Sequence, residues 1–282
     1  MKVYENITDQ CEKLNIKNVT SNDIEAWNKY KSYHHIYNKL WIAESQDMLC
    51  GPMGIEPKKY PIIFKPIINL YGMSRSFKII YNKEEYYKYL KDGLFWMEYL
   101  DGEQYNIDLI ILNGKIKYYT ALKSIPFTEG TFKYHEALPD YILNNNIIDW
   151  INKHFKTYTG CLNIEIINNK IIEAHLRLNG DYYLYDDEFT KELGNLYNHN
   201  SWNYSKKIKK KYLIPIFVNK NIYEINYDSI IQILDNYNCD NIHFDNINSN
   251  YQKETLSRLL MFECKNLKNG LNAKDDILDI IL

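Results

Sequence analysis

A β-hairpin with two facing acids is the feature that most restricts how this chain can fold. Residues 161–167 and 171–176 are apolar, β-rich runs on either side of the loop Asn168-Asn169-Lys170. With this three-residue loop, Glu165 lies directly opposite Glu173 on the same face of the hairpin. Facing carboxylates repel each other unless a cation neutralises them, and two carboxylates at the end of a sheet commonly hold Mg²⁺ with nucleotide phosphates. The hairpin therefore predicts a divalent-metal site.

Two further polar residues share this face. His175 and Arg177 follow Glu173 at intervals of two residues, and a strand returns to the same face every second residue. The face would then carry two carboxylates, one imidazole and one guanidinium. A solvent-facing polar strand is the alternative interpretation.

A second candidate site begins at Lys65, within the apolar strand 62–66. A lysine in an apolar strand needs a partner, and the small-residue loop 69–76 that follows could bring backbone N–H groups close to a phosphate. This loop contains Gly72, Ser74 and Ser76. Because it has a single glycine, a plain β-turn remains the alternative.

A third candidate is the β-run 95–103, which ends in Asp101-Gly102-Glu103. It can be a simple hairpin turn. Alternatively, the extended backbone at 98–100 could hydrogen-bond the edge of an adenine while Glu103 accepts from ribose hydroxyls.

The order of predicted elements indicates an α+β fold. Further strands are expected at 62–66, 77–81, 94–100, 105–112 and 115–122, and helices at 22–33 (capped by Ser21), 83–91 and 140–155. Beyond a lysine-rich run, the expected elements are a strand from 212, a strand at 241–245, and helices at 228–236, 252–264 and 273–280. This last part is predicted to be an appended α/β subdomain.

Charge and hydropathy exclude several classes of protein. The formal net charge is −2, so no whole-molecule field attracts nucleic acid. No apolar stretch approaches the ~20 residues of a membrane helix, and the N-terminus lacks the order of a secretory signal. The five cysteines are widely spaced, which argues against disulfides and zinc sites. A cytoplasmic protein without membrane or nucleic-acid partners is expected.

Taken in order, these segments resemble the ATP-grasp superfamily, which includes D-alanyl-D-alanine ligase, glutathione synthetase and biotin carboxylase. The resemblance covers roughly residues 39–181: a lysine-proline strand, a small-residue loop, Glu-Tyr-Leu-x-Gly-Glu at 98–103, and an acidic hairpin ending in Glu-x-His-x-Arg at 173–177. It implies an ATP-grasp fold in which a nucleotide is held between two α+β subdomains. It also implies an ADP-forming ligase that uses ATP and Mg²⁺ to join a carboxylate to an amine through an acylphosphate.

The resemblance assigns nucleotide-binding roles by position. Matching residues are the two nucleotide lysines Lys39 and Lys65, the phosphate flap with Gly72, Ser74 and Ser76, the adenine hinge Glu98, Tyr99 and Leu100, and the ribose acid Glu103. The implied subdomains are a short N-terminal region 1–60, a small subdomain 61–104 with the flap, a large subdomain 105–205 with the metal site, and the extension 206–282.

The metal and catalytic positions also match, with one departure. Glu165 and Glu173 match the Mg²⁺-binding acids, and Arg177 matches the arginine of the family's last motif, so Lys65 and Arg177 would be catalytic. His175 stands where the family has a metal-binding Asn. Imidazole is a softer ligand than Mg²⁺ prefers, so a site that includes His175 could take Mn²⁺ instead.

A second departure concerns the N-terminus. Only 38 residues precede Lys39, where family members usually carry an α/β domain of about 100 residues that helps to build the substrate pocket. A second copy of the chain or a partner could supply that domain. Small carboxylates and amines, such as amino acids or peptides, are the expected substrates. A small-molecule kinase and an inactive nucleotide-binding module are the alternatives to a ligase.

Overall fold

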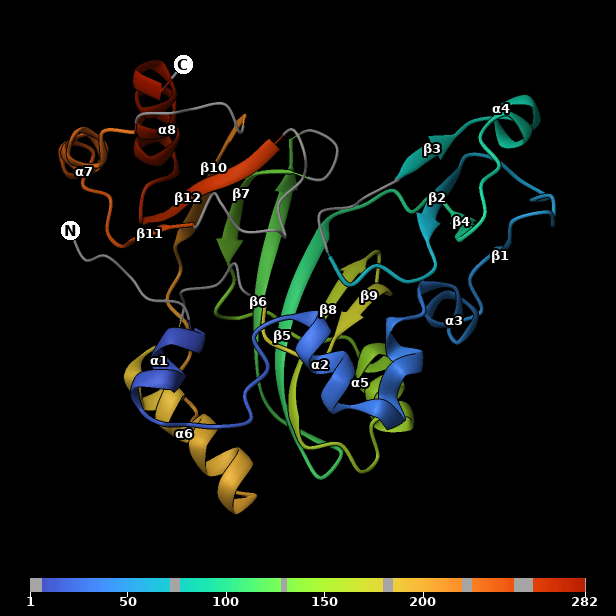
Figure 1. The fold of residues 1–282 in the computed structure, drawn as a ribbon, viewed down its shortest axis with the longest axis horizontal. Coiled ribbons are helices and arrows are strands. Elements are labelled where there is room, and N and C mark those ends of the chain that lie inside the picture. The colour runs from blue at the N-terminus through green and yellow to red at the C-terminus, as the bar shows by residue number, and fades with distance from the viewer. Residues whose placement is uncertain are drawn as a thin grey trace.

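Two β-sheets organise the molecule (Figure 1). The computed structural model describes residues 7–71, 77–127, 131–179, 185–219, 225–245 and 256–281. Within these residues, one sheet has four strands in the order β1-β4-β2-β3, and the other has eight in the order β11-β12-β10-β7-β6-β5-β8-β9.

The small sheet forms a lobe beside the large one (Figure 1). It is antiparallel and consists of β1 (Cys50–Pro52), β2 (Ile62–Pro66), β3 (Lys78–Ile80) and β4 (Leu94–Glu98). Side chains alternate between the two faces of each strand. Phe64 and Trp96 pack with Tyr86 of α4 (Lys83–Lys88), whereas Ile63 and Met97 face the large sheet. The lobe therefore offers one apolar face toward the rest of the protein.

The large sheet is antiparallel throughout. Its strands are β5 (Gln104–Leu112), β6 (Lys115–Pro126), β7 (Phe132–Ala137), β8 (Gly160–Ile167), β9 (Lys170–His175), β10 (Tyr212–Asn219), β11 (Ile242–Phe244) and β12 (Leu256–Cys264). The C-terminal strands join through the pairing of β10 with β7, so the extension continues this sheet.

Helices cover both faces of the large sheet (Figure 1). The N-terminal part supplies α1 (Ile7–Lys13), α2 (Asp23–Lys29), the 3₁₀-helix η1 (Lys31–Tyr37) and α3 (Lys39–Glu44); later helices are α5 (Asn145–His154), α6 (Asp187–His199), α7 (Tyr227–Asn236) and α8 (Leu267–Ile281). One apolar core joins α2, η1, α3 and α5 to β5, β8 and β9. A second joins α1 and α6 to the opposite face, and a third joins α7 and α8 to β10–β12.

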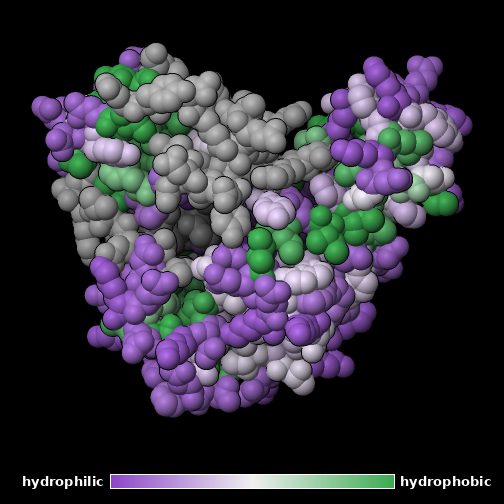
Figure 2. Space-filling view, viewed as in Figure 1, coloured by the Kyte–Doolittle hydropathy of each residue, from purple (hydrophilic) through white to green (hydrophobic). Residues whose placement is uncertain are grey.

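The surface polarity follows this arrangement. On the face seen in Figure 2, the lower, helical part of the molecule is mainly hydrophilic, and hydrophobic side chains gather where the small-sheet lobe joins it. None of the described helices combines the length and the apolar character needed to cross a membrane.

Several elements differ from the sequence-based expectation. The predicted helix 252–264 is wrong where the structure describes it, because Leu256–Cys264 is strand β12, held between β10 and β11. The expected helix 22–33 ends at Lys29 and continues as η1, and its cap is Asn22 rather than Ser21: the Asn22 side chain accepts from the Glu25 N–H at 2.9 Å. Strands β1 and β7 were not predicted, and α5 starts five residues later than expected, because Asn144 caps it.

Candidate active site

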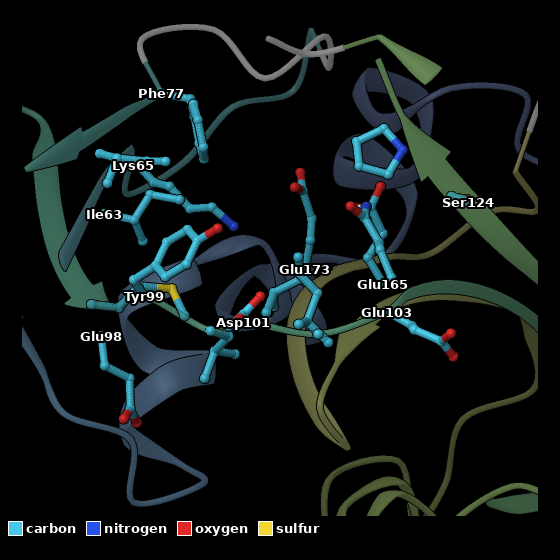
Figure 3. Close-up of a pocket in the computed structure, with 18 of the residues that line it drawn as sticks. Ile63, Lys65, Phe77, Glu98, Tyr99, Asp101, Glu103, Ser124, Glu165 and Glu173 are labelled. Atoms are coloured by element: carbon cyan, nitrogen blue, oxygen red, sulfur yellow. The ribbon is translucent and has the colours of Figure 1, made fainter. Parts of the chain in front are cut away.

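A cavity of about 530 Å³ lies between the two sheets (Figure 3). Its walls come from β2, β3 and β4 on one side and from β5, β6 and the β8–β9 hairpin on the other. This volume lies within the usual range for small-molecule sites, about 300–1,000 Å³. The relative position of the two sheets therefore creates a site large enough for a small ligand.

One end of the cavity is apolar. The small sheet contributes Ile63 and Met97, and the large sheet contributes Ile167 and Ile172. These side chains belong to one packed cluster that spans both sheets. Such a slot suits a flat, largely apolar ring.

Two lysines bring positive charge to the cavity. Lys65 follows Ile63 by two residues, so alternation along β2 directs it into the cavity (Figure 3). Burial and the nearby Lys39 lower the pKa of Lys65 to about 8. Lys39 opens helix α3, whose start is fixed by Asn38: the Asn38 side chain accepts from the Trp41 N–H at 3.0 Å. Both predicted lysines thus line the same cavity.

The two acids line the same cavity as these lysines. Glu165 is paired with Glu173 in the strand register, and both point into the space that Lys65 enters (Figure 3). The turn differs from the prediction. Ile167 pairs with Lys170, so the loop has two residues, and one extra residue, Ile172, then restores the expected pairing as a β-bulge.

The two acids have opposite electrostatic environments. Burial alone would raise the pKa of Glu173, but nearby positive charge, that of Lys39 first, outweighs burial and lowers this pKa to about 2. Lys39 Nζ lies 2.6 Å from Glu173 Oε1. Burial, and then the charge of Glu173, raise the pKa of Glu165, whose Oε2 accepts a hydrogen bond from Gln104 Nε2 at 3.0 Å. Glu173 is therefore the fixed anion of the pair.

The residues predicted to bind metal lie together. One donor atom each from Glu165, Glu173 and His175 can be chosen so that all lie within 4.8 Å of one another. The imidazole approaches the acids through Nε2, which lies 3.5 Å from Glu173 Oε1. Two carboxylate oxygens and a neutral imidazole nitrogen form a donor set that fits Mg²⁺ less well than Mn²⁺, and both ions accept it in proteins.

Arg177 lies beside this cluster but is held by a residue that the sequence did not single out. Asp23, at the start of α2, is 3% exposed. Its carboxylate accepts two hydrogen bonds from Arg177 and one from His175 Nδ1, at 3.0–3.1 Å. In the sequence Asp23 reads as an ordinary acid in the first turn of a helix. No local pattern could have placed it at this site.

The residues predicted to form the adenine hinge, Glu98, Tyr99 and Leu100, differ in their contacts. The Glu98 side chain points away from the cavity and accepts from the Leu49 N–H at 3.1 Å (Figure 3). The backbone N–H groups of Glu98 and Tyr99 donate to the carbonyls of Leu49 and Pro61. A ligand at the hinge can therefore use neither of these two donors, and Leu100 also lines the cavity there.

Four predicted nucleotide-binding residues remain: one lines the cavity, and three lie outside the residues that the structure describes. Glu103 lines the cavity and its carboxylate contacts Lys123 and Tyr105. Gly72, Ser74 and Ser76, predicted to form the phosphate flap, lie outside the described residues.

Solved structures share this architecture. No family model and no curated protein sequence matches the chain. The structure of L-amino acid ligase from Bacillus licheniformis matches 95% of this chain and 75% of its own, with a TM-score of 0.58 and 10% identity. N5-carboxyaminoimidazole ribonucleotide synthetase from Thermus thermophilus matches 93% of this chain and 80% of its own, with a TM-score of 0.62 and 11% identity.

A third similar structure contains a nucleotide. It is the biotin carboxylase domain of 2-oxoglutarate carboxylase from Hydrogenobacter thermophilus, in complex with MgADP, ADP and bicarbonate. It matches 89% of this chain and 67% of its own, with a TM-score of 0.58 and 11% identity. At such low identities the likeness concerns the fold alone. The chain has the ATP-grasp fold that these structures share.

Proposed function

We propose that this protein is an ADP-forming ligase that uses ATP and Mg²⁺ to join a carboxylate to an amine. The observation that carries the proposal is the composition of the cavity. It combines an apolar slot, the two lysines Lys39 and Lys65, and the facing acids Glu165 and Glu173. An apolar slot suits adenine, lysines suit phosphates, and facing acids suit a divalent cation shared with those phosphates.

The proposed reaction has two steps. A carboxylate oxygen of the first substrate attacks the γ-phosphorus of ATP, the bond to the β,γ-bridging oxygen breaks, and ADP leaves. The acylphosphate formed is then attacked at its carbonyl carbon by the amine. Inorganic phosphate leaves, and the amine nitrogen releases a proton. Phosphoryl transfer of this kind asks the protein mainly for positioning and charge neutralisation.

Residues of this chain would supply both the positioning and the charge neutralisation. Lys65 and Arg177 neutralise negative charge, Lys39 binds phosphate, and the backbone near Leu100 holds the base. Glu165, Glu173 and His175 would hold the metal, which when bound neutralises charge on the phosphates. The flap with Gly72, Ser74 and Ser76, the ribose contact of Glu103, and the hinge role of Glu98 and Tyr99 remain parts of the proposal. The proposal also includes a division of the chain into subdomains at residues 1–60, 61–104, 105–205 and 206–282. It includes a cytoplasmic location as well.

The names of the similar structures support this reaction class. They describe an L-amino acid ligase, a ribonucleotide synthetase, and a carboxylase domain bound to MgADP and bicarbonate. Small carboxylates and amines, with amino acids and peptides first, are the proposed substrates.

A substrate screen tests the proposal. The full chain is incubated with ATP, Mg²⁺ or Mn²⁺, and pairs of amino acids, short peptides and small amines, and the nucleotide product is identified. We expect ADP and phosphate in equal amounts, formed only when a carboxylate is present, and a hydroxamate when hydroxylamine replaces the amine. A stable phosphorylated product without any need for an amine would indicate a kinase. ATP binding without turnover on any pair would indicate a nucleotide-binding module.

A further inference from the structure

Asp23 joins two residues of the candidate site that lie far from it in sequence. It begins helix α2, whereas its partners His175 and Arg177 lie at the end of β9 and just beyond it, 152 and 154 positions away. All three contacts use the one carboxylate. Asp23 Oδ2 accepts from His175 Nδ1 and Arg177 Nη2, both at 3.0 Å, and Oδ1 accepts from Arg177 Nε at 3.1 Å.

The contact with His175 has a chemical consequence. The carboxylate can only accept, so Nδ1 of the imidazole must carry the proton that forms this hydrogen bond. In the neutral ring, Nε2 then keeps its lone pair. Nε2 is the atom that lies 3.5 Å from Glu173 Oε1 and faces the acid pair. Histidines that bind metals almost always donate their other ring N–H to a carboxylate, carbonyl or water in this way.

The contact with Arg177 is equally specific. The guanidinium meets the carboxylate through two parallel hydrogen bonds, which fix its plane as well as its position. A lysine or a water could not reproduce this geometry.

We propose that Asp23 is a positioning residue of the active site, which fixes the tautomer and orientation of His175 for metal binding and holds Arg177 beside it. The proposal rests on the proposed metal site. It gives the segment before Lys39 a part in the site that the resemblance to ATP-grasp enzymes does not assign. It also explains how His175 can serve where those enzymes have Asn.

A purely structural ion pair between Asp23 and Arg177 is the competing explanation, and metal binding separates the two. Binding of Mn²⁺ to the full chain is measured by the electron paramagnetic resonance of the free ion, without nucleotide or turnover. Asp23→Asn should weaken Mn²⁺ binding by about 10- to 100-fold, the usual effect of removing the partner of a metal-binding histidine. Glu25→Gln is the matched control, because Glu25 lies on the same helix and its carboxylate accepts from Ser21 and Asn22 instead.

A double-mutant cycle locates the effect. In a His175→Asn background, Asp23→Asn should change Mn²⁺ affinity less than about twofold, because the imidazole that Asp23 positions is gone. Arg177→Gln should weaken Mn²⁺ binding less than Asp23→Asn does. Equal effects of Asp23→Asn with and without His175, or no effect on Mn²⁺ at all, would overturn the proposal.

The wild-type protein provides a test that does not depend on variants folding. The ¹⁵N shifts of the His175 ring should show a protonated Nδ1 and an unprotonated Nε2 in the neutral form, and Nε2 should respond to Mn²⁺. The opposite tautomer, or no Mn²⁺ response, overturns the proposal. Ligase turnover is scored separately: Mn²⁺ binding that depends on Asp23 without turnover on any substrate pair supports the positioning role and counts against the proposed reaction.

Discussion

Lys39 Nζ and Glu173 Oε1 lie 2.6 Å apart, and this ion pair offsets the repulsion between the two facing acids. Lys39 is 6% exposed, so it would lose its partner in a largely buried place if Glu173 were neutralised. Glu165 has no such cation within contact distance among the described residues; Gln104 is its hydrogen-bond partner. The two acids of one pair should therefore respond differently to the same substitution.

The first prediction compares Glu173→Gln with Glu165→Gln in the presence of a chelator. Glu173→Gln should lower the free energy of unfolding by about 1–3 kcal/mol, because a buried charged partner is left unpaired. Glu165→Gln should be neutral or slightly stabilising, because burial and Glu173 already disfavour its charge. Urea unfolding measures both. Both variants should lose most metal-dependent turnover, and equal stability of the two would contradict the assigned asymmetry.

The pH dependence of stability follows from the same pair. Since the folded pKa of Glu173 lies near 2, below its ordinary value of 4.5, its contribution is present above about pH 4.5 and is lost as the pH falls through 2. The raised pKa of Glu165 has the opposite sign: its contribution to stability is lost as the pH rises through that folded pKa. Acid titration of the unfolding free energy of wild type and Glu173→Gln should differ below about pH 4.5. Parallel curves there would show that Glu173 is not the fixed anion.

The third prediction concerns Lys65 and ATP binding. Because its pKa is lowered to about 8, the ammonium loses its proton just above neutral pH, and the attraction for phosphate weakens. ATP affinity should therefore fall as the pH rises through 8 in the wild type, with proton uptake on binding, and should be weak and nearly pH-independent in Lys65→Met. Calorimetric titration in two buffers measures both quantities. Lys78→Met is the control, because Lys78 pairs with Phe64 on the opposite face of the same sheet.

The fourth prediction concerns the hairpin turn. Asn168 and Asn169 both have positive φ, 51° and 59°, as in a two-residue type I′ turn, where glycine is favoured at the second position. Asn169→Gly should leave the free energy of unfolding equal or higher, whereas Asn169→Val should lower it by about 1–2 kcal/mol. A valine variant as stable as the wild type would mean that the turn has a different geometry.

The β8–β9 hairpin shows which structural features could be predicted from local sequence patterns. Facing of Glu165 and Glu173 was predicted correctly from a three-residue loop, although the structure has a two-residue turn and a bulge at Ile172. The two differences cancel, because the shorter turn shifts the register by one residue and the bulge shifts it back by one. Alternation along β2 and β9 likewise indicated which residues share a face, since that depends only on neighbours in the chain.

The features that were predicted wrongly or missed depend on contacts with distant parts of the chain. The residues of β12 include Leu, Met, Arg and Glu, which favour helices, and only pairing with β10 and β11 on both sides makes the segment a strand. Asp23 is brought to His175 by the packing of α2 against η1 and the large sheet, which no short motif encodes. Strand β7 was not predicted, and its His135 is buried, with Nδ1 2.8 Å from Ser124 Oγ.

A crystal structure of the full chain with Mg²⁺ and a non-hydrolysable ATP analogue would show whether the cavity between the two sheets is a nucleotide site. We expect the base between Ile63 and Met97 of one sheet and Ile172 of the other, and phosphates near Lys39 and Lys65. The cation should lie between Glu165 and Glu173. A nucleotide bound outside the cavity between the two sheets, or inside it with its phosphates directed away from the acid pair, would contradict the proposed function.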